Sequence, residues 1–164
     1  MTNALEGLDK INWSNLKHAY GPANDVPILL KTLVEGDKKQ REKVWYEFFG
    51  NIWHQGTIYE ATVFATPFFV KLVQKGPHHD LASILDFLSV LADGTSYLDV
   101  HQDIICSEEE RMSNEHQDQL KKELSWGAAV KTAILVGLDD YKSCLDHSDE
   151  KVREFAQELI LKLE

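Results

Sequence analysis

The stretch of residues 25–52 constrains the fold most, because it has the pattern of two short amphipathic helices folded back on each other. Apolar side chains in its first half follow the i, i+3, i+4, i+7 spacing of a helix with one buried face: Val26, Leu29, Leu30 and Leu33. Gly36 is placed to end this helix in a left-handed conformation, and Asp37 to cap the next one. The apolar stripe of the second helix follows: Val44, Trp45, Phe48, Phe49 and Ile52. We therefore expect a helical hairpin here.

This hairpin has echoes further along the chain. The shift that places Pro27 on Pro67 also aligns other helix-breaking and apolar positions: Gly36 with Gly76 and Val44 with Ile84. A larger shift aligns charged positions: Asp37 with Asp149 and Arg41 with Arg153. The sequence therefore predicts one all-α domain over residues 1–164, built as a stack of about three helical hairpins.

Three boundaries between these helices are readable from turn and cap residues. Asp25 follows the helix-breaking dipeptide Gly21-Pro22 and is placed to cap the first hairpin. Residues 93–112, DGTSYLDVHQDIICSEEERM, interrupt the repeat with turn-forming residues, so we expect an irregular loop there. Asn114, with Gln117 three residues later, is placed to cap the small-residue-rich helix that follows.

Composition places the chain among ordinary globular proteins of the cytoplasm. A chain of 164 residues that is 43% hydrophobic can bury a core. The N-terminus has no basic start followed by a long apolar run, and the most apolar later stretch, AAVKTAILVGL, is short and contains Lys131, so we expect neither a signal peptide nor a membrane span. The two cysteines, Cys106 and Cys144, lack metal-binding or redox spacing, which favours reduced thiols and a cytoplasmic location.

The net charge of −10 is concentrated towards the C-terminus. Acidic and basic residues balance over residues 1–50, whereas residues 101–164 contain 15 acidic residues and 8 basic ones. Such a surface repels phosphate backbones, so nucleic acid is not an expected partner. A basic or mixed-charge protein surface is the natural complement.

Two segments resemble helical-repeat proteins of the HEAT type. Six positions within residues 145–163 fit the turn and second helix of a HEAT-like repeat: Leu145, Asp149, Val152, Arg153, Ala156 and Leu159. The series HAYG, DVP, GNI and HQGT within residues 18–62 is similar to that of a group of bacterial HEAT-repeat proteins. This resemblance implies an α-α superhelix, or solenoid, whose usual role is to present a groove or face to another macromolecule, and it does not by itself imply an enzyme activity.

The connector WHQGTIY, which follows the first hairpin, is the preferred candidate site. Trp53, His54, Gln55 and Tyr59 place more aromatic and hydrogen-bonding groups there than a turn requires. A structural interpretation stays open, in which Trp53 fills the core and His54, Gln55 and Thr57 bond to helix-end backbone groups. The candidate protein-binding residues are these four together with three others: Trp45, Asp139 and Asp140.

Metal and nucleophilic chemistry receive weaker support. A cation would need donors from distant segments to converge: His78, His79, Asp80, His101, Asp103 and His116. No HxxxH or HExxH pair anchors such a site, so we expect no metal and no cofactor. Cys106 stands beside acidic residues and has no base placed near it by the sequence, so we expect an inert thiol.

Three functional hypotheses follow. The first is a non-enzymatic protein-interaction module. The second is an immunity- or antitoxin-like binder, in which a small acidic protein blocks a basic partner by charge complementarity. The third is a metal-dependent enzyme or a cofactor lyase of the kind that some short HEAT-like proteins resemble.

Overall fold

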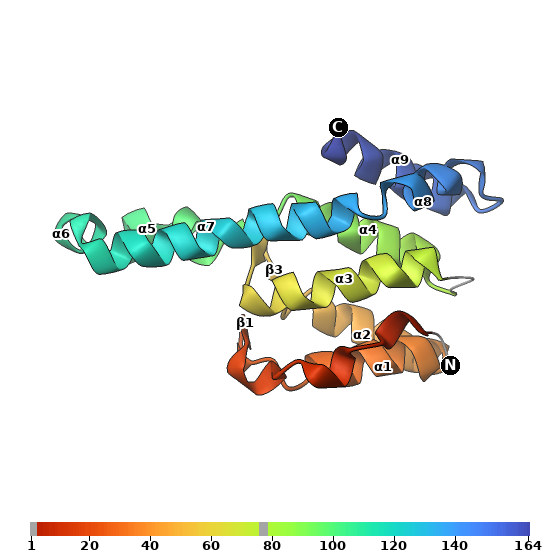
Figure 1. Cartoon of the computed structure of the whole chain (residues 1–164), viewed down its shortest axis with the longest axis horizontal. Helices are drawn as coiled ribbons and strands as arrows, with labels where there is room; N and C mark the ends of the chain where they lie inside the picture. Colours follow the sequence, from red (N-terminus) through yellow and green to blue (C-terminus); the bar gives the residue numbers. More distant parts are fainter. Residues whose placement is uncertain (1–2, 76–78) are drawn as a thin grey trace.

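The computed structural model describes residues 3–75 and 79–164. Helices make up most of it, which confirms the all-α expectation, although short strands are also present. The helices stack from α1 and α2 at the bottom of Figure 1, through α3 and α4, to α8 and α9 at the top, with the long α7 lying across the upper part. Among helices in the described ranges, none combines the length and the apolar composition that crossing a membrane requires.

The N-terminal third contains three short 3-10 turns, a two-stranded antiparallel pair and the first hairpin. The turns are η1 (Asn3–Leu5), η2 (Leu8–Lys10) and η3 (Trp13–Asn15), and the strands are β1 (Lys17–His18) and β2 (Gly21–Pro22). The hairpin helices are α1 (Val26–Glu35) and α2 (Lys38–Phe48). Asp37 caps α2 in a full capping box, because its side chain accepts from the amide of Gln40 while the Gln40 side chain accepts from the amide of Asp37.

Two expectations about the first hairpin are wrong in detail. Gly36 is extended (φ −74°, ψ 158°) and not left-handed. Glycine fits here for a different reason, since a Cβ at this position would lie 2.5 Å from the carbonyl oxygen of Thr32. Asp25 has helical backbone angles and makes no cap bond, because its carboxylate is occupied by His18 and Asn51.

The second hairpin is framed by a small sheet. Its helices are α3 (Glu60–Gln74) and α4 (Leu81–Ala92), and the three strands are β3 (Trp53–His54), β4 (Thr57–Ile58) and β5 (Thr95–Ser96). β3 and β4 are antiparallel, whereas β4 and β5 are parallel, with Thr57 opposite Thr95 and Ile58 opposite Ser96. The sheet therefore joins the connector before α3 to the connector after α4. Residues 76–78, where the end of α3 was expected at Gly76-Pro77, lie outside the described residues.

The expected irregular loop over residues 93–112 is instead helical. It contains β5, then α5 (Tyr97–Ile105) and α6 (Glu108–Met112). Its polar residues act as helix caps: Ser96 accepts from the amide of Asp99, and Ser107 forms a capping box with Glu110. The acidic run of Glu108, Glu109 and Glu110 occupies the first turn of α6, where the helix dipole favours negative charge.

The C-terminal part completes the stack. Its elements are α7 (Asn114–Leu135), α8 (Leu138–Ser143), η4 (Cys144–Asp146) and α9 (Glu150–Leu163). Ser113 caps α7, so the expected cap at Asn114 is wrong by one residue. Asp149, which the internal repeat aligns with Asp37, caps α9. α9 packs on α4, and Ser89 of α4 donates to Glu158 of α9.

An aromatic cluster lies where α2, α3 and α4 meet. The rings of Phe48, Phe69 and Phe87, all fully buried, have centroids 5.1 to 5.9 Å apart. Trp45 and Phe49 pack at its edge. This cluster couples the first hairpin to the second through the burial of large apolar surfaces.

Candidate functional site

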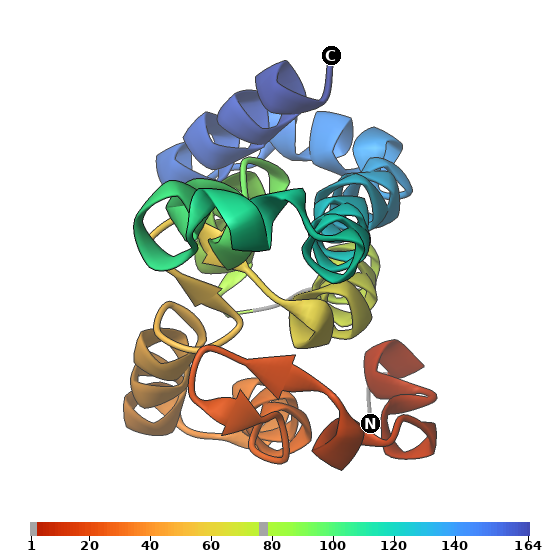
Figure 2. The same ribbon diagram turned by 90° about the vertical axis from the view of Figure 1, so that its left-hand side faces the viewer.

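Three tyrosines lie in the connectors before, between and after the first two helical hairpins, each directly before or after a short strand. Tyr59 follows β4 and Tyr97 follows β5, and because these strands pair in parallel register, both tyrosines leave the sheet at the same edge. Tyr20 lies in the turn between β1 and β2. The three tyrosines are spaced almost evenly along the sequence. The short strands of these connectors lie on the side of the molecule that faces the viewer in Figure 2.

In the second connector, which runs from α2 to α3, a tight hairpin turn joins β3 to β4. Gln55 and Gly56 both have positive φ (50° and 89°), as the two central residues of a type I′ turn require. The Thr57 hydroxyl donates to the carbonyl of His54 at 2.7 Å, which closes the turn. His54 Nδ1 lies 3.0 Å from the carbonyl of Gly50. Since a carbonyl only accepts, Nδ1 carries the proton, and Nε2 is left as the acceptor of the neutral ring.

A second set of hydrogen bonds holds the first connector, residues 17–22 before α1, against the loop that follows α2. His18 Nδ1 accepts from the amide of Tyr20 at 3.1 Å, so Nε2 is the nitrogen that donates to Asp25 at 2.8 Å. The other carboxylate oxygen of Asp25 accepts from Asn51 Nδ2 at 2.9 Å. The β1–β2 pair is thereby tied to the loop after α2, which fixes the position of Tyr20.

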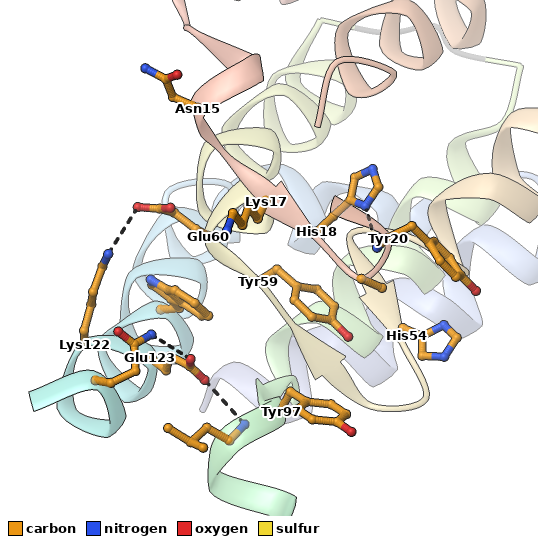
Figure 3. Close-up of a pocket in the computed structure, with 14 residues that line it drawn as sticks. Asn15, Lys17, His18, Tyr20, His54, Tyr59, Glu60, Tyr97, Lys122 and Glu123 are labelled. Atoms are coloured by element: carbon orange, nitrogen blue, oxygen red, sulfur yellow. Dashed lines mark hydrogen bonds and ion pairs between the residues drawn. The ribbon is translucent and has the colours of Figure 1, made fainter. Parts of the chain in front are cut away.

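These connectors and α7 enclose an open cleft of about 710 Å³. Figure 3 shows Tyr59 in the middle of the group, with Tyr20 and His54 on one side of it and Tyr97 below. Further lining comes from α3 and α7: Glu60, Lys122, Glu123 and Trp126. The cleft is thus lined by aromatic faces together with charges of both signs.

Tyr59 is the most constrained of the tyrosines. Burial raises its pKa above the ordinary value for a phenol, and the neighbouring Tyr97, Tyr20 and Glu123 add to this effect, so it stays protonated at neutral pH. Its hydroxyl lies 2.8 Å from that of Thr57, whose own proton is donated to His54. Tyr59 therefore donates to Thr57, and its oxygen lone pairs can accept a hydrogen bond from a bound group.

The charged groups of the cleft are partly paired with each other. Lys122 lies 4.0 Å from Glu60, and Glu123 accepts from Gln119 at 2.8 Å and from the amide of Leu98 at 3.4 Å. The carboxylates are therefore held in place by neighbours on α5 and α7. They can still accept hydrogen bonds from the cleft, because each has free lone pairs.

Of the residues selected from the sequence, the structure brings His54 and Tyr59 together in this cleft. Gln55 is exposed at the tip of the hairpin turn and does not line it. Trp53 is half-buried against Phe49, with ring centroids 5.8 Å apart, which agrees with the core-filling interpretation.

The remaining three selected residues lie elsewhere. Trp45 packs against the aromatic cluster and donates through Nε1 to Asp80 at 3.2 Å. Asp139 and Asp140 are in the first turn of α8, and Asp140 accepts from Gln74 at 3.1 Å. In Figure 1, α8 lies towards the right-hand end of the molecule, away from β1 and β3.

The candidate metal donors do not form a cluster in the described residues. No group of three His, Cys, Asp or Glu side chains there has an arrangement that could hold a metal ion. His101 stacks on Tyr97 at 4.1 Å between centroids, and Asp103 is paired with Arg111. His116 bonds to Gln102 at 3.1 Å. His78 lies outside the described residues.

Sequence reasoning missed several residues of the cleft: His18, Tyr20, Tyr97 and Trp126. A signal for the tyrosines was present, because their spacing in the sequence is close to the shift that relates Pro27 to Pro67. Nothing comparable marks Trp126, which reaches the cleft only because α7 crosses the connectors.

Comparisons with known proteins give no relative: no protein-family model, no curated protein and no solved structure matches this chain.

Proposed function

We propose that this protein is a non-enzymatic interaction module, built as a HEAT-like superhelix, that binds a segment of another protein in the tyrosine-lined cleft. One observation carries the proposal, namely the convergence of Tyr20, Tyr59 and Tyr97 from three successive connectors on one open cleft. Solenoid proteins commonly bind partners along one edge of the stack, and the connectors form such an edge.

The composition of the cleft suits a protein segment. Tyrosine and tryptophan supply large, rigid contact areas at a low cost in side-chain entropy, and they are enriched at the energetic centres of interfaces. Tyr20 is 73% exposed and Tyr97 is 45% exposed. A partner that covers these rings would therefore bury substantial apolar surface.

The polar groups of the cleft match the needs of a peptide. Tyr59, His54 and Glu123 offer acceptors, whereas Lys17 and Lys122 offer donors. A peptide backbone presents both kinds of group and loses affinity when either kind is left unpaired. The mixed lining is thus better suited to a peptide than to a purely apolar ligand.

The test compares partner capture by matched tyrosine variants. The double variant Tyr20→Ala/Tyr97→Ala removes two exposed rings from the cleft, and Tyr46→Ala removes a ring that is 82% exposed on α2, outside the cleft. We expect the unchanged protein and Tyr46→Ala to capture the same partner protein equally from native lysate. The double variant should bind that partner with an affinity lower by roughly tenfold or more. Quantitative mass spectrometry identifies it, and titration calorimetry with the purified partner measures the affinity.

Two outcomes would overturn this function. One is that no protein is captured specifically by the unchanged chain. The other is that the double variant binds the captured partner as tightly as Tyr46→Ala does, which would move the binding surface away from the cleft. Circular dichroism of both variants controls for folding.

A further inference from the structure

Residues 97–124 form an arm that consists of α5, α6 and the N-terminal half of α7. Figure 1 shows the arm extending beyond the rest of the stack, with α6 at its tip. None of the residues in the arm is buried. The two buried residues of α7, Val130 and Ile134, both lie outside the arm. The arm is thus helical without a core of its own, although helices of this length depend on tertiary packing for most of their stability.

One face of α5 is apolar and faces solvent. Tyr97, Val100, His101 and Ile104 have the i, i+3, i+4, i+7 spacing of a core-facing helix stripe. Yet Val100 is 51% exposed and Ile104 is 82% exposed, and Met112 of α6 is 78% exposed. By contrast, the corresponding stripe of α9 is buried: Val152, Ala156, Leu159 and Ile160.

The other side of α5 explains why the stripe is free. Leu98 and Cys106 lie with residues of α7 around a shallow depression, and Gln102 bonds to His116 of α7 at 3.1 Å. α5 therefore uses its half-polar side to contact α7. The more apolar stripe is directed away from that contact.

The arm also holds a large share of the negative charge of the protein. It contains eight acidic residues and three basic ones, while the whole chain has a net charge of −10. One of its cations, Arg111, is paired with Asp103. On α5 itself, the exposed Asp99 and Asp103 stand directly before Val100 and Ile104 in the sequence. An exposed apolar stripe with carboxylates beside it is complementary to a helix that is apolar on one face and basic on its flanks.

We propose that the arm docks a basic amphipathic helix of another protein, with its apolar face on Val100 and Ile104 and its lysines or arginines against the acids of the arm. A second copy of this chain is a poorer occupant, because arm-to-arm contact would bring like charges together. This docking surface goes beyond the proposed function: Tyr97 borders both surfaces, but Val100 and Ile104, which carry the docking, do not line the cleft.

The probe for the test is a labelled model peptide of leucine and lysine, arranged with the period of an amphipathic helix. Val100→Ser/Ile104→Ser removes the stripe at two exposed positions, and Ile28→Ser is the matched control at a 65% exposed isoleucine of α1. We expect fluorescence anisotropy to show saturable binding to the unchanged protein and to Ile28→Ser. The stripe variant should bind about tenfold or more weakly, and added salt should weaken the binding.

Several outcomes overturn the proposal. It is wrong if the peptide does not bind the unchanged protein, if a leucine–glutamate peptide of the same pattern binds equally well, or if Ile28→Ser loses binding as much as the stripe variant does. Sedimentation that shows a dimer lost in the stripe variant would assign the stripe to a second copy. Tyr20→Ala should leave peptide binding unchanged, which separates this result from any failure of the cleft.

Discussion

Arg41 of α2 donates through Nε to Oδ2 of Asp80 at 3.0 Å, and thereby joins the first hairpin to the start of α4. Both side chains are largely buried, with exposures of 14% and 18%. Trp45 donates to the same oxygen, and a second guanidinium nitrogen of Arg41 donates to the carbonyl of Gly36 at 2.9 Å. Arg41 is one of the basic residues at the start of α2, and this ion pair balances its charge.

Asp80→Ala should destabilise the protein by about 3 kcal/mol, because it leaves the largely buried Arg41 guanidinium without its counter-charge. Urea unfolding followed by circular dichroism measures the change. The control is Glu42→Ala, which removes the partner of Lys38 in an exposed ion pair at 4.0 Å and should cost less than about 0.5 kcal/mol. Equal losses in the two variants would contradict the structural importance of the Arg41–Asp80 pair.

Gln55→Gly should stabilise the protein by about 0.5 to 1 kcal/mol, because Gln55 holds a positive φ of 50° that glycine adopts without strain. Gly56→Ala is the reverse test, since φ is 89° there and alanine is strained. Thermal unfolding of both variants should give shifts of opposite sign. A loss of stability in Gln55→Gly would mean that the glutamine side chain makes a compensating contact.

Gly94→Ala should destabilise the protein by about 1 to 3 kcal/mol through overpacking. A Cβ at Gly94 would overlap Cγ2 of Ile58 and lie 3.1 Å from the carbonyl of Leu91, so Ile58 of β4 or the backbone that leads into β5 must shift. Gly127→Ala is the control, because the nearest atom there is 3.5 Å away. Because the β4–β5 pair places Tyr59 and Tyr97, Gly94→Ala should also weaken partner binding at the cleft, which calorimetry can measure separately from stability.

Asp86→Asn should stabilise the protein at neutral pH but not in acid. Burial raises the pKa of Asp86 above its ordinary value of 3.8, and Glu158 adds to this while Lys162 opposes it. The ionised carboxylate is therefore less favourable in the folded state than in the unfolded state. Replacing it removes this penalty, by about 0.5 kcal/mol after allowance for solvent screening.

The sign of this effect gives its pH dependence. Below pH 3.8 the carboxyl group is protonated in both states, so the gain from Asp86→Asn should vanish there and reach its full value above the raised folded pKa. Urea unfolding from pH 3 to 7 measures this. Asp118→Asn, an exposed position on α7, should change stability by no more than about 0.5 kcal/mol. A gain from Asp86→Asn that is independent of pH would contradict the assignment to the carboxylate.

Much of the helical architecture was readable from local patterns. The stripes of Leu30, Leu33 and Val44 predicted the first hairpin, and the cap at Asp37 is where the sequence placed it. The sequence-based predictions were wrong where a residue typical of one local structure forms a different one in the folded protein. Asp25 resembles an N-cap but bonds to His18 and Asn51, and the turn-forming residues of 93–112 cap helices instead of forming a loop.

The candidate site was only partly predictable for the same physical reason. The connector around His54 and Tyr59 was selected because it contains more aromatic and hydrogen-bonding side chains than a turn requires. Tyr97 is brought to Tyr59 in the cleft because β5 pairs with β4, 38 residues earlier in the sequence. Tyr20 is held there because Asp25 bonds both to His18 and to Asn51, in the loop after α2.

The sequence by itself determined the helices, because their periodicity and capping depend on neighbours within a few residues of one another. Only the tertiary structure decided which faces remained free. The cleft exists because three connectors lie side by side, and the stripe of Val100 and Ile104 is exposed because α5 turns its other side to α7. Neither is encoded in local spacing, since burial depends on what lies across from a residue in space and not on what lies next to it in the chain.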